Sequence, residues 1–464
     1  MTTQGGSSSR ATIALTLLVL INLFNYIDRQ ILSAVESPME ETFFPESEYP
    51  RDPKTRQRED KTIQGKMGSL NIAFMATYIL IAPLFGFLAD RTPRWLLVGV
   101  GVIAWSLATG ATGLAGTFAI LFFTRCLVGV GEAAYGPVAP TVISDLYPGE
   151  KRGSKMALFY AAIPVGSALG YVIGGQVTTL ARGFVEVPGE SWRWAFYVVV
   201  PPGLLLGLWC FFMKDPPRGA GAAAAAVHKV SWADYLAILK TPSYTLTTLG
   251  MTAMTFALGG MAFWMPRYGV QRQAVEGMSQ VELDALFNEV NFTFGIIVVV
   301  SGLGATLAGM VVADRLKARI PGAYLLVSAL AMALAFPMVL CTLFTPFPMA
   351  WIFVFLACFC LFFNTGPTNT ILANVTHPAT RASAFALNIL IIHALGDAVS
   401  PAIIGVINGY TGDMTYGFLA VSFACLIASA LWFAGMKHLA RDTAQVSGPI
   451  EPPVNDGVPP ATPL

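Results

Sequence analysis

The chain has 464 residues, of which 55% are hydrophobic and only 12% are charged, and its formal net charge is +1. Because a typical soluble domain is about 25% charged, this composition indicates an integral membrane protein and excludes an electrostatic case for nucleic-acid binding. All six cysteines lie inside apolar runs, where free thiols behave as small hydrophobic side chains, so we expect no disulfide framework, metal site or cofactor.

Windows of about 20 apolar residues, the length of a helix that crosses a bilayer, recur twelve times along the chain. The first window follows a polar start and lacks a small-residue cleavage site, so we expect a retained span rather than a signal peptide. The sequence therefore predicts an all-α, multi-pass membrane protein with twelve transmembrane helices. The predicted spans are 12–34, 67–88, 95–115, 118–142, 154–180, 194–213, 243–266, 290–312, 322–343, 349–373, 381–409 and 414–436.

Lysine and arginine residues predict the orientation of these spans. An even number of spans places both ends of the chain on the same side of the membrane. The connections on that side are rich in basic residues, among them Arg91, Arg94, Lys151 and Arg315. By the positive-inside rule, both termini are predicted to be cytoplasmic.

An internal repeat divides the spans into two pseudo-symmetric bundles of six. The sequence GFLADRTPR at 86–94 returns as GMVVADRLKAR at 309–319, each time between two spans in matching positions of the halves. Duplicated halves around one midplane site are typical of secondary transporters. The predicted segments are an N-terminal tail at 1–11, six-helix bundles at 12–213 and 243–437, a linker at 214–242 and a disordered cytoplasmic tail at 438–464.

Two connections differ from the others. Residues 35–66 form a mixed-charge insertion with several prolines on the outer face. We expect a solvated loop there, and the alternative is a lid over the outer mouth. The central linker holds a run of Gly and Ala and then a short amphipathic helix, which would lay Trp232 and Leu236 on the membrane surface.

The repeated Asp-Arg motif predicts a gate on the cytoplasmic face. Together with an acid at the end of the fourth span, these charges would form an ion-pair cluster that locks the inner face and breaks when the halves rock. The alternative is that they only mark the membrane boundary. The predicted gate residues are Gly86, Asp90, Arg91, Arg94, Asp145, Asp314 and Arg315.

Charged side chains inside the spans are the most informative feature of the sequence. The first span carries Asp28 and Arg29, and the fourth carries Arg125 and Glu132. Seven residues make nearly two turns of a helix, so Arg125 and Glu132 share a face about 10 Å apart along the axis. An ionisable group at membrane depth costs several kcal/mol unless it faces the protein interior or a wet cavity, so we expect these side chains to meet in a cavity.

The chemistry of these four residues suggests one role for the two arginines and another for the two acids. The two arginines would bind an anionic headgroup, such as a phosphate or carboxylate, through forked hydrogen bonds. The two acids would carry protons, because burial raises the pKa of a carboxyl and a nearby arginine lowers it. A permanent, inert cluster of buried ion pairs is the alternative. The predicted substrate and proton-coupling site is Asp28, Arg29, Arg125 and Glu132.

The second half contributes few polar side chains. His393 and Asp397 share a face of the eleventh span, but Ser400 is about 10 Å farther along from His393, so a hydrolytic triad is excluded and a polar lining or proton relay is expected. Polar residues surround Pro367 in the tenth span, as in kinked segments that line cavities. The expected lining residues are Asn25, Tyr26, Tyr160, Phe256, Trp264, Asn364, Thr368, His393 and Asp397.

An otherwise apolar second half opposite a charged first half predicts an amphipathic cargo. Ordinary core packing would also account for any one of the aromatic residues. No nucleophile and base lie within reach of each other, so a membrane enzyme is disfavoured, as is a receptor without transport activity.

Three motifs carry a resemblance to a known family. The GFLADR-x-x-R loop, R-x-x-x-G-x-G-E in the fourth span and PVGSALGYVIGG in the fifth span resemble the major facilitator superfamily over residues 12–437. Within that superfamily, NYIDRQILS in the first span and RCLVGVGEAAYGPVAPTVISDLYP in the fourth resemble the spinster family of lysolipid and sphingosine-1-phosphate transporters, here in a form similar to bacterial members.

The resemblance implies a twelve-helix major facilitator fold with alternating access in a bacterial inner membrane. It implies a cargo with a phosphate-bearing head and one acyl chain, and proton-linked switching that carries onto Asp28, Arg29, Arg125 and Glu132. We therefore expect a monomeric secondary transporter whose partners are an amphipathic lipid, protons and membrane lipids, with no nucleic acid. A proton-coupled drug or organic-anion carrier of the same superfamily is the alternative, because such carriers share the N-Y-x-D-R pattern.

Overall fold

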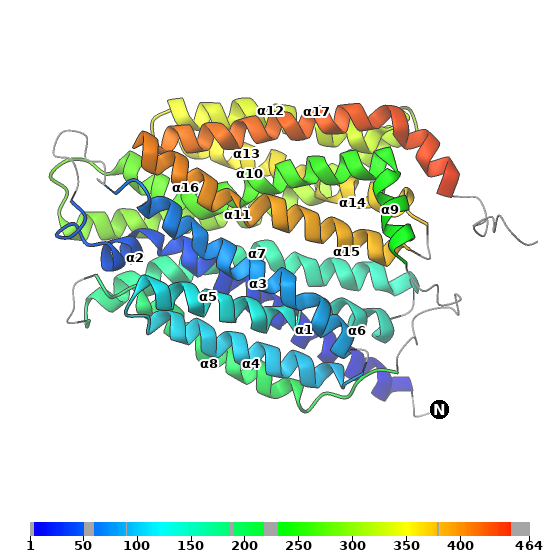
Figure 1. Cartoon of the computed structure of the whole chain (residues 1–464), viewed down its shortest axis with the longest axis horizontal. Helices are drawn as coiled ribbons and strands as arrows, with labels where there is room; N and C mark the ends of the chain where they lie inside the picture. Colours follow the sequence, from blue (N-terminus) through cyan, green and yellow to red (C-terminus); the bar gives the residue numbers. More distant parts are fainter. Residues whose placement is uncertain are drawn as a thin grey trace, which may run out of the picture.

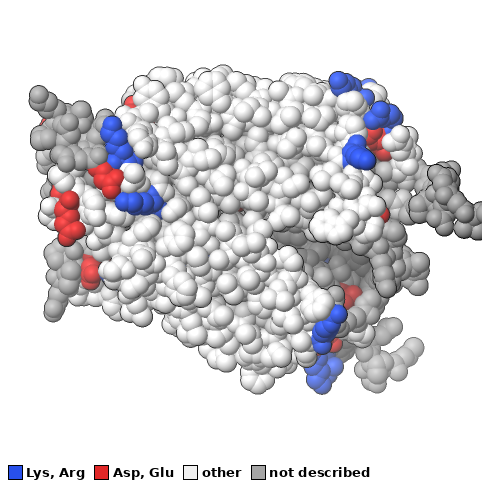
Figure 2. Space-filling view, in the orientation of Figure 1, with Lys and Arg blue, Asp and Glu red and all other residues white. Residues whose placement is uncertain are grey.

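The computed structural model describes residues 4–50, 60–89, 91–147, 149–185, 189–217, 231–377 and 380–446. Every regular element in these residues is a helix, and most of the helices lie side by side along one direction (Figure 1). The described chain begins and ends at the right of Figure 1, and we call this end of the molecule the terminal face. Helix α2 (Glu36–Phe43) lies at the other end, which we call the opposite face. Charged residues gather near these two ends, and the surface between them carries almost none (Figure 2).

The twelve predicted spans all correspond to helices. Eleven helical stretches are long and apolar enough to cross a membrane. The predicted fourth span makes the twelfth, and it falls short of that length because a turn at 134–138 divides it into α5 and α6. The first half comprises α1 (Gln4–Ala34), α3 (Ile63–Ala89), α4 (Arg94–Gly113), α5 (Phe118–Ala133) with α6 (Ala139–Leu146), α7 (Gly149–Arg182) and α8 (Arg193–Cys210).

The second half repeats this pattern with two further broken spans. The expected kink in the tenth span is confirmed, since the helix is interrupted at Asn364. The eleventh span contains a π-helix, η1 (His393–Asp397). The second half comprises α10 (Pro242–Gln273), α11 (Gln280–Lys317), α12 (Ala323–Phe344), α13 (Ala350–Phe363) with α14 (Thr365–Asn374), α15 (Arg381–Ile392) with η1 and α16 (Ser400–Thr411), and α17 (Met414–Val446).

A stripe of small residues on α7 explains how the first half packs. A Cβ on Gly166 would lie 2.4 Å from the Leu23 carbonyl oxygen of α1, and a Cβ on Gly174 would lie 2.6 Å from the Cβ of Ala34. Only glycine allows the two backbones to approach this closely. The stripe therefore holds α7 against α1 within one half.

The two halves meet toward the opposite face. Here α3 packs on α16, where a Cβ on Gly68 would lie 2.3 Å from the Pro401 carbonyl oxygen. Deeper in the molecule, Tyr171 on α7 donates a hydrogen bond to the Ala262 carbonyl of α10 at 2.6 Å. Toward the terminal face the surface is hollowed between the halves (Figure 2). This arrangement is closed at the opposite face and open at the terminal face.

Part of the insertion at 35–66 differs from the solvated loop that its charges suggested, whereas residues 46–48 are exposed turns as expected. Residues Glu36–Phe43 form helix α2, in which Glu36, Met39 and Glu40 are buried. The reason is that both acids bind Arg267 of the second half. The alternative of a lid over the outer mouth fits this part of the insertion, and residues 51–59 lie outside the described chain.

The tails and the linker also differ in part from expectation. Helix α1 begins at Gln4, inside the predicted N-terminal tail, and α17 continues to Val446, inside the predicted disordered tail. Helix α17 persists because Asp442 accepts hydrogen bonds from the backbone nitrogen and hydroxyl of Ser243 at 2.9 and 2.7 Å. The tail after residue 446 and the Gly/Ala run of the linker lie outside the described residues.

The amphipathic helix predicted in the linker is present as α9 (Trp232–Lys240). Ser231 and Asp234 form a capping box at its start, which fixes where the helix begins. Trp232 and Leu236 are 86% and 57% exposed. Their contact with the membrane surface stays a prediction.

Candidate functional site

Helices α1 and α5 bring the predicted charges of the first half together. Nε and Nη2 of Arg29 both donate to Oε2 of Glu132, at 2.9 and 2.7 Å. The neighbouring Asp28 points to α4, where its Oδ2 accepts a hydrogen bond from the Thr109 hydroxyl at 3.3 Å. Adjacent residues on a helix face different directions, so Arg29 of α1 faces α5 and Asp28 of α1 faces α4.

The glycines of the R-x-x-x-G-x-G-E motif allow this approach. A Cβ on Gly129 would lie 2.2 Å from the backbone oxygen of Phe74 on α3, and a Cβ on Gly131 would lie 2.6 Å from the backbone nitrogen of Trp105 on α4. Without side chains at these two positions, α5 lies directly against both neighbours, and Glu132 reaches Arg29.

Aromatic rings surround the two arginines. The Cζ atom of Arg29 lies 5.0 Å from the ring centroid of Tyr26, 4.8 Å from that of Phe74 and 5.8 Å from that of Tyr78. The Cζ atom of Arg125 lies 5.6 Å from the Phe74 centroid. Aromatic faces stabilise a guanidinium at this range by about 0.5–2 kcal/mol. The rings therefore hold both cations in place beside Glu132.

The sequence analysis missed Phe74, Tyr78 and Thr109. Phe74 and Tyr78 are four residues apart on α3 and thus share one face, which is the only signal that would have marked them. Thr109 is fully buried in an apolar span, so its hydroxyl needs a partner, but the sequence does not say which.

The cluster is deeply buried, yet its polar atoms are not all satisfied. Asp28, Arg125 and Glu132 are 3%, 2% and 1% exposed, whereas the Arg29 side chain is 16% exposed. Within the described chain, five buried atoms of the cluster and its neighbour Asn25 make no hydrogen bond: Asp28 Oδ1, Arg125 Nε and Nη1, Glu132 Oε1 and Asn25 Nδ2.

Each unsatisfied buried polar group costs about 1–3 kcal/mol, and more for a charged group. An inert cluster of ion pairs would waste that free energy. That cost favours the predicted binding of a proton or a polar ligand at these atoms over an inert cluster, and this role stays a prediction.

The other expected lining residues divide into two groups. Tyr26 and Phe256 are partly buried, and Tyr160 is 47% exposed. In the π-helix, Nδ1 of His393 lies 3.0 Å from both carboxylate oxygens of Asp397, and both side chains are partly exposed. π-Helical turns are frequent at functional sites, which keeps this pair a candidate.

Trp264, Asn364 and Thr368 do not line an open space in this conformation. Trp264 is fully buried and donates a hydrogen bond to the Pro401 carbonyl of α16 at 2.9 Å. Asn364 and Thr368 are also fully buried, and they bond to carbonyls of their own broken span, those of Leu361 and Asn364. Their side-chain hydrogen bonds to backbone carbonyls thus stay within the broken span.

The described residues of the predicted gate are paired within their own halves here. Arg94 Nη1 binds Asp145 Oδ2 at 2.7 Å, and Nη2 donates to the Pro216 carbonyl at 2.9 Å. In the second half, Asp314 accepts a hydrogen bond from the Tyr324 hydroxyl at 2.6 Å.

The remaining gate residues that the structure describes show no contact with the other half within the described chain. Arg91 and Arg315 are exposed, the guanidinium of Arg91 lying over the Phe87 ring, and Gly86 has open space at its Cα. Asp90 lies outside the described residues. These placements accord with a terminal face that is open, and the gating role stays a prediction.

Comparisons with known proteins agree with this architecture. A family model of the Major Facilitator Superfamily matches residues 18–401. Protein spinster homolog 3 of zebrafish (Danio rerio) is 33% identical over 443 residues, which cover 92% of this chain and 84% of that protein. Human (Homo sapiens) spinster homolog 1 is 32% identical over 416 residues, which cover 87% of this chain and 74% of that protein.

Solved structures share the fold. A bacterial homolog of the human lysosomal transporter spinster, in an inward-facing and unoccupied conformation, matches with a TM-score of 0.76 at 20% identity, covering 93% of this chain and 98% of that one. A D-xylose-proton symporter matches with a TM-score of 0.68 at 15% identity, covering 90% of this chain and 96% of that one. The chain thus belongs to the major facilitator superfamily and, within it, to the spinster family of membrane transporters.

Proposed function

We propose that this transporter moves a single-chain lipid with an anionic or zwitterionic head, such as a lysophospholipid or sphingosine-1-phosphate, by proton-coupled alternating access. The observation that carries the proposal is the buried cluster of two arginines and two acids on α1 and α5, with polar atoms of both signs left without a hydrogen bond. Its partly exposed member is Arg29.

The arginines supply the headgroup chemistry. Arg29 binds Glu132 through two nitrogens, and Arg125 keeps two nitrogens without a hydrogen bond within the described chain. A planar guanidinium is suited to bind a phosphate or carboxylate through two parallel hydrogen bonds. An arriving headgroup would compete with Glu132 for Arg29 and complete the hydrogen bonds of Arg125.

The acids supply the coupling. Within the described residues, Oε1 of Glu132 and Oδ1 of Asp28 have no hydrogen-bond donor, so either oxygen could take a proton. When a headgroup draws Arg29 away from Glu132, the buried carboxylate loses its counter-charge and protonation becomes favourable. Substrate and proton would in this way be linked through one ion pair.

The second half offers the apolar side chains that a lipid tail would contact. The predicted spans of that half carry few charged side chains, His393 and Asp397 among them, and aromatic and sulfur-containing side chains such as Phe256 and Met310 remain only partly buried. A charged half opposite an apolar half suits a cargo with a polar head and one acyl chain. We also propose that both termini face the cytoplasm, from the distribution of Lys and Arg.

Transport by purified protein in liposomes tests the proposal. Uptake of a labelled lysophospholipid driven by a pH gradient should be lost in Arg125→Gln and Glu132→Gln and retained in Glu190→Gln. Glu190 is the matched control, because its ion pair with Arg193 lies within one half and outside the cluster. Undiminished uptake in both cluster variants would refute the proposal. Competition by water-soluble organic anions but not by single-chain lipids would favour the organic-anion carrier.

A further inference from the structure

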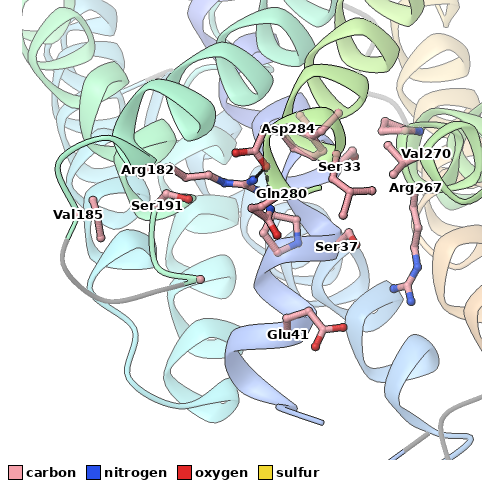
Figure 3. Close-up of a pocket in the computed structure, with 16 residues that line it drawn as sticks. Ser33, Ser37, Glu41, Arg182, Val185, Ser191, Arg267, Val270, Gln280 and Asp284 are labelled. Atoms are coloured by element: carbon pink, nitrogen blue, oxygen red, sulfur yellow. Dashed lines mark hydrogen bonds and ion pairs between the residues drawn. The ribbon is translucent and has the colours of Figure 1, made fainter. Parts of the chain in front are cut away.

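Two groups of ion pairs join the halves at the opposite face. Arg182 on α7 pairs with Asp284 on α11, and Arg267 on α10 binds Glu36 and Glu40 on α2. A pocket of about 620 Å³ lies beside them, lined by Arg182, Asp284 and Arg267 among others. Figure 3 shows Arg182 and Asp284 pointing toward each other across this pocket, with Arg267 on another wall.

Glu36, Glu40 and Arg267 form a buried cluster that we call the outer triad. Nη1 of Arg267 lies 3.0 and 3.2 Å from the two carboxylate oxygens of Glu36. Arg267 binds both carboxylate oxygens of Glu40. Its Nη2 donates to Oε1 at 3.0 Å, and its Nη1 contacts Oε2. The acids are 1% exposed and the arginine side chain 4%. Since acids and arginine come from different halves, the triad exists only while the opposite face is closed.

The triad holds two carboxylates against one guanidinium. Carboxylates that share a dry site do not both ionise without cost. Arg267 uses both Nη atoms for Glu40 and shares only Nη1 with Glu36, so the charge of Glu36 is the less well compensated. Burial raises the pKa of Glu36 to about 7, with Arg267 opposing this rise and Glu40 adding to it.

We propose that Glu36 is a proton-binding site that controls the opposite face of the transporter. The protonated carboxyl stays in the closed triad, and release of its proton to water on that side favours separation of α2 from α10. This site is separate from the acids of α1 and α5, and its test requires no cargo.

Other charged groups near Glu36 also affect its protonation. Glu41 is a third acid of α2, and Lys66 on α3 lies 5.4 Å from the ring of Phe44 at the end of α2. Lys66 is itself paired with Asp60 at 3.2 Å. The titratable and charged groups around Glu36 in the described chain are Glu40, Glu41, Tyr49, Asp60, Lys66, Arg182, Arg267 and Asp284.

The sign of the pH effect follows from the two states of Glu36. In the closed state its pKa is about 7, and in an open state that exposes it to water the pKa returns toward the ordinary value of 4.5. Between these values the closed state binds more protons, so rising pH destabilises it. The ratio of closed to open molecules falls by up to about tenfold per pH unit in this window and changes little outside it.

Distances between spin labels at the opposite face test the proposal. Leu114 and Phe344, both exposed and one in each half, are replaced by labelled cysteines in a chain whose six native cysteines are replaced by serine or alanine. Electron resonance distances are then recorded from pH 4.5 to 9. The native triad should be closed at low pH and should open progressively as the pH rises from about 4.5 to about 7. A distance distribution that does not change with pH would overturn the proposal.

Two variants and a control identify the responsible acid. Glu36→Gln mimics the protonated carboxyl and should keep the face closed at every pH. Glu40→Gln leaves Arg267 to pair with Glu36 alone, which lowers the pKa of Glu36 in the closed state, so the pH response should become smaller and end at a lower pH. Glu190→Gln should follow the native chain, because its partner Arg193 lies in the same half. An unchanged pH response in both triad variants would overturn the assignment to Glu36.

The same titration in Glu132→Gln separates this inference from the proposed function. A transition that persists in Glu132→Gln and disappears in Glu36→Gln belongs to the outer triad, whatever the cargo is. A transition that disappears in Glu132→Gln and persists in Glu36→Gln would overturn the inference and leave the proposed function standing.

Discussion

Glu132 is the central residue of the proposed site. One of its carboxylate oxygens accepts two hydrogen bonds from Arg29, while the other makes none within the described chain and the side chain is almost fully buried. A carboxyl in this position gains stability from Arg29 as an anion and has a free oxygen for a proton. Under the proposed function this second oxygen is the proton site.

Replacing Glu132 by glutamine should uncouple transport from protons. The amide oxygen still accepts hydrogen bonds from Arg29, so the helices keep their contact, but the side chain no longer titrates. Uptake driven by a pH gradient should fall by more than about tenfold, a change that corresponds to about 1.4 kcal/mol. Exchange of labelled for unlabelled lipid without a gradient should continue, and its loss together with uptake would instead indicate a structural role for Glu132.

Phe74 should contribute to cargo binding through the arginines. Phe74→Leu keeps an apolar side chain and removes the ring face that both guanidiniums contact, which we expect to cost about 1 kcal/mol, or about fivefold in affinity for a lysolipid. Binding measured by fluorescence or calorimetry checks this. Phe196→Leu is the control, because that ring is equally buried and contacts Trp192 instead. Equal losses in both variants would reduce Phe74 to ordinary packing.

The sequence allowed prediction of the four charges but not of their surroundings. A charge in an apolar span is conspicuous because its burial is costly, so Asp28, Arg29, Arg125 and Glu132 could be identified directly. An aromatic residue such as Phe74 is ordinary in a span, and nothing in a single sequence shows that it lies between two arginines. Arg267 escaped notice because the predicted seventh span ended one residue before it.

Among the elements, α3 and α16 form a close contact between the two halves. Gly68 on α3 lies against the backbone of α16, whereas at Gly86, near the other end of α3, an added Cβ would meet no atom of the described residues within 4 Å. The same helix is therefore tightly packed toward the opposite face and unpacked toward the terminal face. Rocking of the halves would reverse these environments.

Gly68→Ala should push the opposite face open. Its Cβ would lie 2.3 Å from the Pro401 carbonyl oxygen, a backbone atom that moves only with its helix. Label distances between Leu114 and Phe344 should lengthen in Gly68→Ala at pH 5, where the native face is expected to be closed. Gly86→Ala is the matched control and should leave that distance unchanged. Closed faces in both variants would show that α16 shifts without affecting the gate.

The long apolar windows made the spans predictable, but the breaks within the spans were harder to predict. The interruption at Asn364 could be foreseen from Pro367 and its polar neighbours, but the π-helix at His393–Asp397 and the turn between α5 and α6 could not. Helix α2 was misjudged because its glutamates resemble those of a solvated loop. Their partner Arg267 is more than 200 residues away in the sequence, so only the fold reveals the contact.

Over the whole molecule, the charges are arranged on two levels between the halves. The outer triad and the Arg182–Asp284 pair join the halves at the opposite face, and the cluster of α1 and α5 lies deeper, within the first half. The hollow at the terminal face in Figure 2 indicates which side the interior is open to in this conformation. Alternating access requires that the cluster of α1 and α5 face a cavity that opens to one side of the membrane in one state and to the other side in the other state.

Chemical access to Tyr26 tests that requirement most directly, because Tyr26 is partly buried and lies beside Arg29. In a chain without native cysteines, Tyr26→Cys is treated with a membrane-impermeant thiol reagent from either side of vesicles, with the buried Val199→Cys as the unreactive control. We predict that Tyr26→Cys reacts from the side of the terminal face and that a lysolipid slows the reaction. A Tyr26→Cys thiol that reacts from neither side, or at a rate that lysolipid does not alter, would contradict a cargo site at Arg29 and Glu132.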